Sequence, residues 1–243
     1  MSIRNQRGFT IIELLLFLAI TGALFVALMV GVNSNIVQQQ YRDSVVAYTS
    51  LLQQQYSDVA NTRNDRGDDW TCSDSVVEQS DTAGEFRGTT SCVIMGRYVQ
   101  AVDGGTKVRV GSIIGSRPNN ADTLLSDTQT VLAYNPRVSP VDSAVQDITW
   151  GSRLVKPETD NVPSTMSFVI IRSPLSGLIR VYNSEDELPA TLTNMIHEDS
   201  ARLKIKACVA SSDLMTGPRY SVEVNPSIAG PNGVITGVGD EQC

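Results

Sequence analysis

One apolar stretch near the N-terminus constrains this chain more than any other feature. Residues 9–32 carry a single charged side chain, Glu13, among apolar residues, glycine and threonine. At about 1.5 Å per residue, this stretch makes a helix of about 36 Å, which is enough to cross a bilayer core of about 30 Å. The sequence therefore predicts a transmembrane helix over residues 9–32.

The residues before this stretch predict its orientation. Arg4 and Arg7 precede the apolar run, and no acidic residue occurs among the first eight. The positive-inside rule then predicts a single-pass protein with Met1 in the cytoplasm and the bulk of the chain outside. A cleaved secretory signal is the alternative. The length of the run and the carboxylate of Glu13 inside it argue against that alternative, because an intramembrane charge is costly and marks a function.

Gly8, Phe9 and Glu13, with Arg7 before them, stand at the offsets of a prepilin signal. The N-terminus therefore resembles that of type IV pilin-like proteins over about its first 35 residues. The resemblance implies that a prepilin peptidase cuts after Gly8 and methylates the new amine of Phe9. It also implies that Glu13 pairs with the Phe9 amine of a neighbouring subunit and so sets the register of assembly. The proline found within the membrane helix of many type IVa pilins is missing here, where Val30 and Gly31 stand.

The helix is expected to continue beyond the membrane to about Asn61. Residues 33–63 contain neither glycine nor proline. Mostly apolar residues recur there at helical spacing, which predicts an amphipathic helix with one buried face. A coiled-coil stalk is the alternative. The members of this stripe are Val37, Tyr41, Val45, Tyr48, Leu52, Gln55 and Val59.

Residues 64–243 read as a separate β-rich globular domain that follows a leader, 1–8, and the two helical segments. Short runs of Val, Ile and Tyr between turns predict strands, and Ser173–Gly177 reads as a hairpin connection. The expected fold class is α+β, with a long N-terminal helix packed on an antiparallel sheet, as in pilins. Strands are predicted at 92–102, 107–114, 130–134, 148–155, 166–172, 178–182, 203–210 and 220–224, and short helices at 123–127 and 187–197.

Four cysteines, Cys72, Cys92, Cys208 and Cys243, all lie outside the apolar stretch. No two form a CxxC pair, so a zinc site is poorly supported. An even number of cysteines in an oxidising space predicts two disulfides. Three pairings are open; Cys72 with Cys92 and Cys208 with Cys243 are favoured because short loops close more easily. Four reduced thiols are the alternative.

Charge and motifs point away from nucleic acid and from catalysis. The net charge is −7, from 19 basic and 26 acidic residues, so no overall basic face for nucleic acid is expected. His197 is the single histidine, and it reads as a surface or helix-end residue. No nucleophile elbow, phosphate-binding loop or dinucleotide fingerprint occurs. We expect no enzymatic activity, no cofactor and no metal.

The predicted function is that of a structural subunit of a type IV pilus-like filament. The size of the C-terminal domain favours a minor pilin. The alternatives are a pseudopilin of a type II secretion system, a tip adhesin or DNA-binding minor pilin, and an enzyme tethered by one helix. The expected partners are other pilin subunits, the prepilin peptidase, the assembly platform and the membrane. The Gly-rich stretch 227–243 is a candidate for subunit contact or adhesion.

Overall fold

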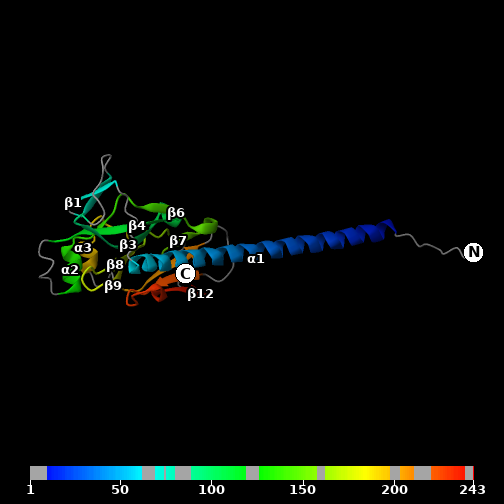
Figure 1. The fold of residues 1–243 in the computed structure, drawn as a ribbon. Helices are drawn as coiled ribbons and strands as arrows, with labels where there is room; N and C mark the ends of the chain where they lie inside the picture. Colours follow the sequence, from blue (N-terminus) through cyan, green and yellow to red (C-terminus); the bar gives the residue numbers. More distant parts are fainter. Residues whose placement is uncertain are drawn as a thin grey trace, which may run out of the picture. The chain divides into compact units, whose positions relative to one another are not determined.

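The structure is a computed structural model that divides into two compact units, residues 1–41 and 42–243. It describes residues 10–61, 69–73, 75–79, 89–118, 126–157, 162–197, 203–210, 220–238 and 243. We call residues 42–243 the head. The helix α1, Ile11–Ala60, runs through both units, from blue to cyan in Figure 1. The predicted long helix is thus confirmed over its described residues.

Within the head, α1 presents one buried face. Val45, Tyr48, Leu52 and Val59 are buried on it, as the predicted stripe requires. Of the stripe members that precede the head, Val37 is half-buried and Tyr41 is buried. The face also holds polar groups: the Thr49 hydroxyl donates to the carbonyl of Val45 (2.9 Å), which satisfies it within the helix. The remaining buried members are Ser44, Gln55 and Tyr56.

The larger sheet of the head is antiparallel, with strand order β5-β4-β3-β8-β9 and β6 also paired with β4. β3 and β4 are its longest strands and pair over most of their length. β8 and β9 form a hairpin closed by the turn Ser173–Gly177, where Gly177 takes φ +74°. The strands are β3 Cys92–Val102, β4 Lys107–Ser116, β5 Arg137–Val138, β6 Ala144–Asp147, β8 Ser167–Arg172 and β9 Ile179–Ser184.

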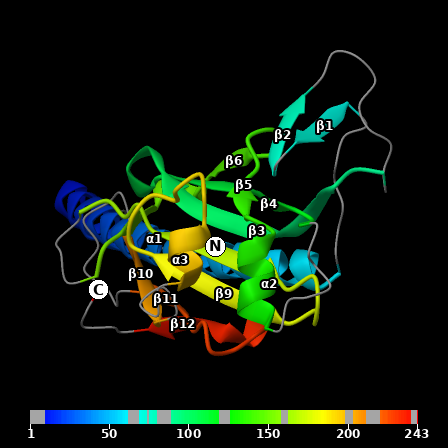
Figure 2. The same cartoon turned by 90° about the vertical axis from the view of Figure 1, so that its left-hand side faces the viewer.

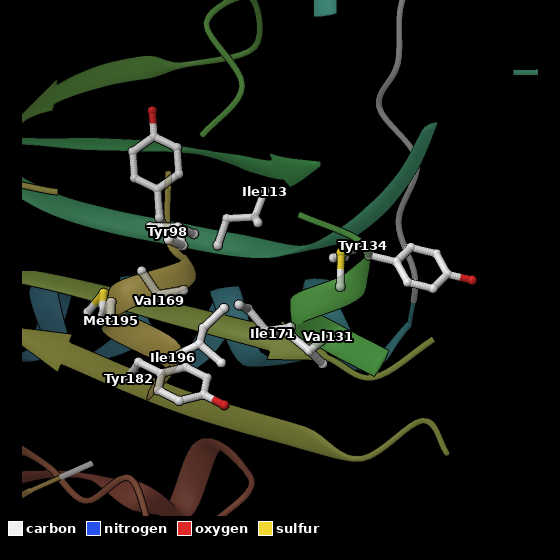
Figure 3. Packing of buried hydrophobic residues seen from close by; sticks show 11 residues of the cluster. Tyr98, Ile113, Val131, Tyr134, Val169, Ile171, Tyr182, Met195 and Ile196 are labelled. Atoms are coloured by element: carbon white, nitrogen blue, oxygen red, sulfur yellow. The ribbon is translucent and has the colours of Figure 1, made fainter. Parts of the chain in front are cut away.

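Helices cover both faces of this sheet. The short helices α2, Asp127–Ala133, and α3, Thr193–His197, lie on one face (Figure 2). Strand residues such as Ile113, Val169 and Ile171 meet Val131 of α2 and Ile196 of α3 there in one buried cluster (Figure 3). Residues 42–60 of α1 lie on the opposite face. The large sheet therefore forms the middle layer of the head.

A second antiparallel sheet has the order β12-β11-β10-β7. Its strands are β7 Arg153–Val155, β10 Ile205–Ala210, β11 Tyr220–Val224 and β12 Val234–Val238. The side-chain amide of Gln53 on α1 donates to the carbonyl of Val234 (3.3 Å), so this sheet also contacts the helix. A separate hairpin, β1 Trp70–Ser73 with β2 Val76–Gln79, packs through Trp70 and Val77 against Ile114.

The α+β prediction is confirmed, but two predicted strands are wrong. Residues 130–134 lie in and just after α2, because Ser126 accepts a hydrogen bond from the amide of Gln129 (3.2 Å) and starts a helix. Of residues 148–155, only β7 is a strand; Thr149–Gly151 form a 3-10 turn.

Other boundaries also differ from the predictions. Of the predicted helix 123–127, residues 123–125 lie outside the described residues, and α2 begins at Asp127. The predicted helix 187–197 is reduced to α3, Thr193–His197. Strands β1, β2, β5, β6 and β12 were not predicted, since each is short or lies among turn residues.

Candidate functional site

The first turn of α1 holds the residue on which the assembly prediction depends. The backbone amide of Glu13 donates to the Thr10 hydroxyl (3.3 Å), and the amide of Leu14 donates to the Thr10 carbonyl (3.1 Å). Thr10 with Glu13 three residues later is the spacing of a capping box. This signal is readable in the sequence from the two residue types and their spacing. Gly8 and Phe9, the predicted cleavage and methylation residues, lie outside the described residues.

The Glu13 side chain is exposed in the first turn of α1. A carboxylate is favoured there, because the N-terminal end of a helix carries partial positive charge. An exposed carboxylate near the start of an apolar helix is also available to a cation from outside the chain. This geometry is compatible with the predicted role of Glu13.

From Ile11 to Val32, every side chain except that of Thr21 is exposed. The Thr21 hydroxyl donates to the carbonyl of Phe17 (2.8 Å), so its polar group is satisfied within the helix. Such back-bonding suits a helix in an apolar solvent, where water cannot compensate a free hydroxyl. By length and composition, α1 is the one helix among the described residues that can cross a membrane.

A polar network that is not among the sequence predictions joins α1 to the larger sheet. Arg97 on β3 donates through Nε to the amide oxygen of buried Gln55 (3.3 Å) and through Nη1 to the Ser112 hydroxyl (2.9 Å). Asp142 lies 4.0 Å from Nη1 of Arg97 and accepts from the amide of Ser112 (3.3 Å). Spacing alone cannot find this network, because its members come from four separate segments.

The structure contains two disulfides, Cys72–Cys92 and Cys208–Cys243, with Cα–Cα distances of 6.0 and 5.4 Å. These are the two pairings that the short-loop argument favours. The first ties the β1–β2 hairpin to the start of β3. The second ties the last residue of the chain to the buried strand β10.

The candidate contact region 227–243 is held by more than a disulfide. β12 pairs with β11 from Val224↔Val234 to Tyr220↔Val238. The amide of Asn225 donates to the Gly233 carbonyl (2.8 Å) and closes the connection between the two strands. Residues 239–242 lie outside the described residues.

His197 is the exposed last residue of α3, which confirms the prediction of a helix-end position. No group of three or more metal-ligating side chains occurs within the part of the chain that the structure describes. Asn183, Glu185 and Asp186 line a hollow of about 480 Å³ beside α3. The two carboxylates are not part of a group of three or more His, Cys, Asp or Glu side chains among the described residues.

Residues 3–29 match the family model described as the prokaryotic N-terminal methylation motif. No curated protein and no solved structure matches the chain. The motif and the long apolar helix together confirm a type IV pilin-like prepilin signal. They support a protein of the type IV pilin or pseudopilin class. Proteins with this motif are structural rather than enzymatic. The motif and the helix are also consistent with membrane anchoring, with assembly with other pilin subunits and with processing by a prepilin peptidase.

Proposed function

We propose that this protein is a structural subunit of a type IV pilus-like filament and not an enzyme. Among the possible subunits, we favour a minor pilin. The single observation that carries the proposal is the N-terminal methylation motif at residues 3–29, which overlaps the part of α1, residues 11–32, whose apolar side chains are exposed. A prepilin peptidase cuts after Gly8 and methylates Phe9. The subunit waits in the cell membrane with its N-terminus in the cytoplasm, and the assembly platform then inserts it into the filament.

Assembly in this proposal depends on Glu13. The Phe9 ammonium of one subunit pairs with the Glu13 carboxylate of a neighbour when the apolar helices pack together. The attraction between the two charges offsets part of their desolvation penalty. Because the pair forms at one axial offset, it fixes the register. Removing one partner of a buried pair leaves the other uncompensated, at a cost of about 3–5 kcal/mol.

Two measurements on the full chain test the proposal. Mass spectrometry of mature protein is expected to show an N-methylated Phe9 as the first residue; an intact leader would overturn the proposal. Glu13→Ala is expected to stay in the membrane fraction but to enter sheared filaments at least about tenfold less than the parent. Gln39→Ala, a change at an exposed position of the same helix, serves as the control and is expected to assemble normally.

A pseudopilin of a type II secretion system is the alternative within the same class. Both use the same N-terminal motif, so the motif does not separate them. A minor pilin is expected in purified extracellular filaments at a low copy number relative to a major subunit. Recovery only in the periplasm, with a secretion defect on deletion, would favour the pseudopilin.

A further inference from the structure

The β1–β2 hairpin is attached to the head differently from the other strands. β1 and β2 pair with each other over the full length of both strands. Within the part of the chain that the structure describes, neither strand pairs with the larger sheet or with the second sheet. Figure 2 shows the hairpin standing apart from the strands of the larger sheet. A two-stranded hairpin is marginally stable at best in water when it stands alone, so this hairpin depends on contacts outside its own ladder.

Non-covalent contacts dock the hairpin over a small area. Trp70 of β1 and Val77 of β2 pack with Ile114 of β4 in one buried cluster. Between the strands, the Ser75 hydroxyl donates to the carbonyl of Tyr134 (3.2 Å). The hairpin is therefore held against the head by a few side chains rather than by a ladder of backbone hydrogen bonds.

The disulfide Cys72–Cys92 adds a covalent link to these contacts. Cys72 lies within β1, and Cys92 is the first residue of β3. β3 pairs with β4 from Cys92↔Ser116 onward, so the Cys92 end of the link is fixed in the larger sheet. A covalent link of this kind keeps the hairpin close to its docking surface and raises its effective concentration there. Both cysteines are half-buried, so the link is partly open to solvent.

The second disulfide has a different structural setting. Cys208 lies on β10, which is hydrogen-bonded to β11 on one side and to β7 on the other. Cys208 itself is 1% exposed. Opening the Cys208–Cys243 link leaves β10 held by two neighbouring strands. Opening the Cys72–Cys92 link leaves the hairpin held by its side-chain contacts.

The docked hairpin covers apolar surface. Trp70 is 7% exposed, and Val77 and Ile114 are each 3% exposed. These three side chains, together with Val93 of β3, line a narrow hollow between the hairpin and the larger sheet. Val93 is already 37% exposed. If the hairpin leaves, Ile114 loses its contacts with Trp70 and Val77, and an apolar patch opens beside Val93.

We propose that the Cys72–Cys92 disulfide is a redox switch that controls the docking of the β1–β2 hairpin. In the oxidised state the hairpin is held on Ile114. In the reduced state the hairpin undocks and uncovers the apolar patch of Trp70, Val77 and Ile114. The switch lies wholly within the head, and it does not depend on the proposed filament function.

The chemical step is thiol–disulfide exchange with a protein or small molecule that carries two thiols. One thiolate of this reductant attacks a sulfur of the Cys72–Cys92 link, which forms a mixed disulfide and frees the other cysteine. The second thiolate of the reductant then breaks the mixed disulfide. Cys72 and Cys92 together gain two electrons and two protons, and the reductant becomes a disulfide. Oxidation by a disulfide-bearing protein reverses the step.

Hydrogen exchange of the full chain in detergent micelles tests the switch, with dithiothreitol as the reductant. Alkylation of an aliquot and peptide mapping measure how far Cys72 and Cys92 are reduced. On reduction, the amides of β1 and β2 are expected to exchange at least about tenfold faster, as for a unit that opens locally. The amides of β3 and β10 are expected to keep their protection. Oxidised glutathione is expected to restore the protection of the hairpin.

Tryptophan fluorescence gives a second measurement. Trp70 and Trp150 are the two tryptophans of the chain, so Trp150→Phe leaves Trp70 as the single reporter. Reduction is expected to shift its emission to longer wavelength and to raise its quenching by acrylamide towards the value of the urea-unfolded protein. Without reductant, Cys72→Ser with Cys92→Ser is expected to show the same exposed Trp70. Cys208→Ser with Cys243→Ser is the matched control, in which Trp70 is expected to stay protected until reductant is added.

Three results would overturn the inference. The first is a Cys72–Cys92 link that dithiothreitol does not reduce while the head is folded. The second is full protection of the hairpin amides and of Trp70 after the link has been reduced. The third is an equal loss of protection in β3 and β10, because the disulfide would then support the whole head rather than control one hairpin.

Discussion

Two stretches of the same helix, residues 11–32 and 42–60, meet opposite surroundings. In the first, fifteen large apolar side chains are exposed. In the second, apolar side chains are gathered on one face and buried by the two sheets of the head. Both stretches are continuous helix. The difference shows that apolar content alone does not predict burial within a chain; the distribution of the apolar residues around the helix does.

The physical reason is that the two stretches need different partners to cover their apolar side chains. A helix that is apolar on one face has its apolar surface removed from water when a single sheet or domain packs on that face. A helix that is apolar all round needs an apolar solvent or several helical neighbours. Burying each large apolar side chain gains about 1.5–3 kcal/mol, so exposure of the first stretch to water is very unfavourable. In the proposed function, a membrane before assembly and other helices in the filament would each remove that cost.

The largest expected effect concerns the Cys208–Cys243 disulfide, which lies in the head. Replacing Cys208 and Cys243 together by alanine opens a link with a sequence separation of 35, which is expected to lower the free energy of unfolding of the head by about 4 kcal/mol. Urea unfolding followed by tryptophan fluorescence measures it, because both tryptophans lie in the head. The helical signal of residues 11–41 in detergent micelles is expected to persist. If the double variant were as stable in urea as the parent protein, the prediction would be wrong.

A matched pair of leucines tests the comparison on α1 itself. Leu52 is 2% exposed and Leu18 is 57% exposed. Leu52→Ala is expected to destabilise the head by about 3 kcal/mol, through lost burial and a cavity. Leu18→Ala in the same full-length protein in micelles is expected to leave the urea midpoint unchanged. Equal effects of the two substitutions would mean that residues 11–32 also stabilise the head.

The smallest effect concerns the hydroxyl of Tyr56, which is buried and has no hydrogen-bond partner among the described residues. Removing an unsatisfied buried hydroxyl is neutral or favourable, so Tyr56→Phe is expected to change the stability by between 0 and about +1 kcal/mol at pH 7. Thermal unfolding at fixed protein concentration measures it. A loss above that range would show that the hydroxyl has a partner in solution.

The same tyrosine gives the head a dependence on alkaline pH. Burial raises the pKa of Tyr56 to about 12, above its ordinary value near 10. The folded state therefore keeps the phenol neutral where the unfolded state ionises it. The associated stability is complete below pH 10 and is lost as the pH rises through about 12. Tyr56→Phe is expected to lose less stability than the parent between pH 10 and pH 12.

Several elements of the head could be read from local pattern. Strands β3 and β11 lie where alternating apolar residues between turns predict them. The hairpin turn at Ser173–Gly177 and the helix end at His197 were also predictable, because turn residues and helix boundaries carry local chemical signals. The N-terminal signal was readable for the same reason: Gly8, Phe9 and Glu13 lie within one short segment of the sequence.

Other features depended on distant residues. Residues 130–134 carry a pattern that fits a short strand, but the Ser126 cap and the packing of Val131 on the sheet make them helical. β12 follows a Gly-rich stretch, and its pairing with β11 supplies the hydrogen bonds that its own composition does not predict.

By itself, the sequence determined the membrane-length helix, the prepilin signal and the α+β class, because each follows from residues close together in the chain. Only the tertiary structure decided which strands form each sheet, which strands lie beside the predicted face of α1, and how Arg97 joins that face to the larger sheet. These depend on contacts between residues far apart in sequence. Such contacts form when the head packs as a whole, and no single segment encodes them.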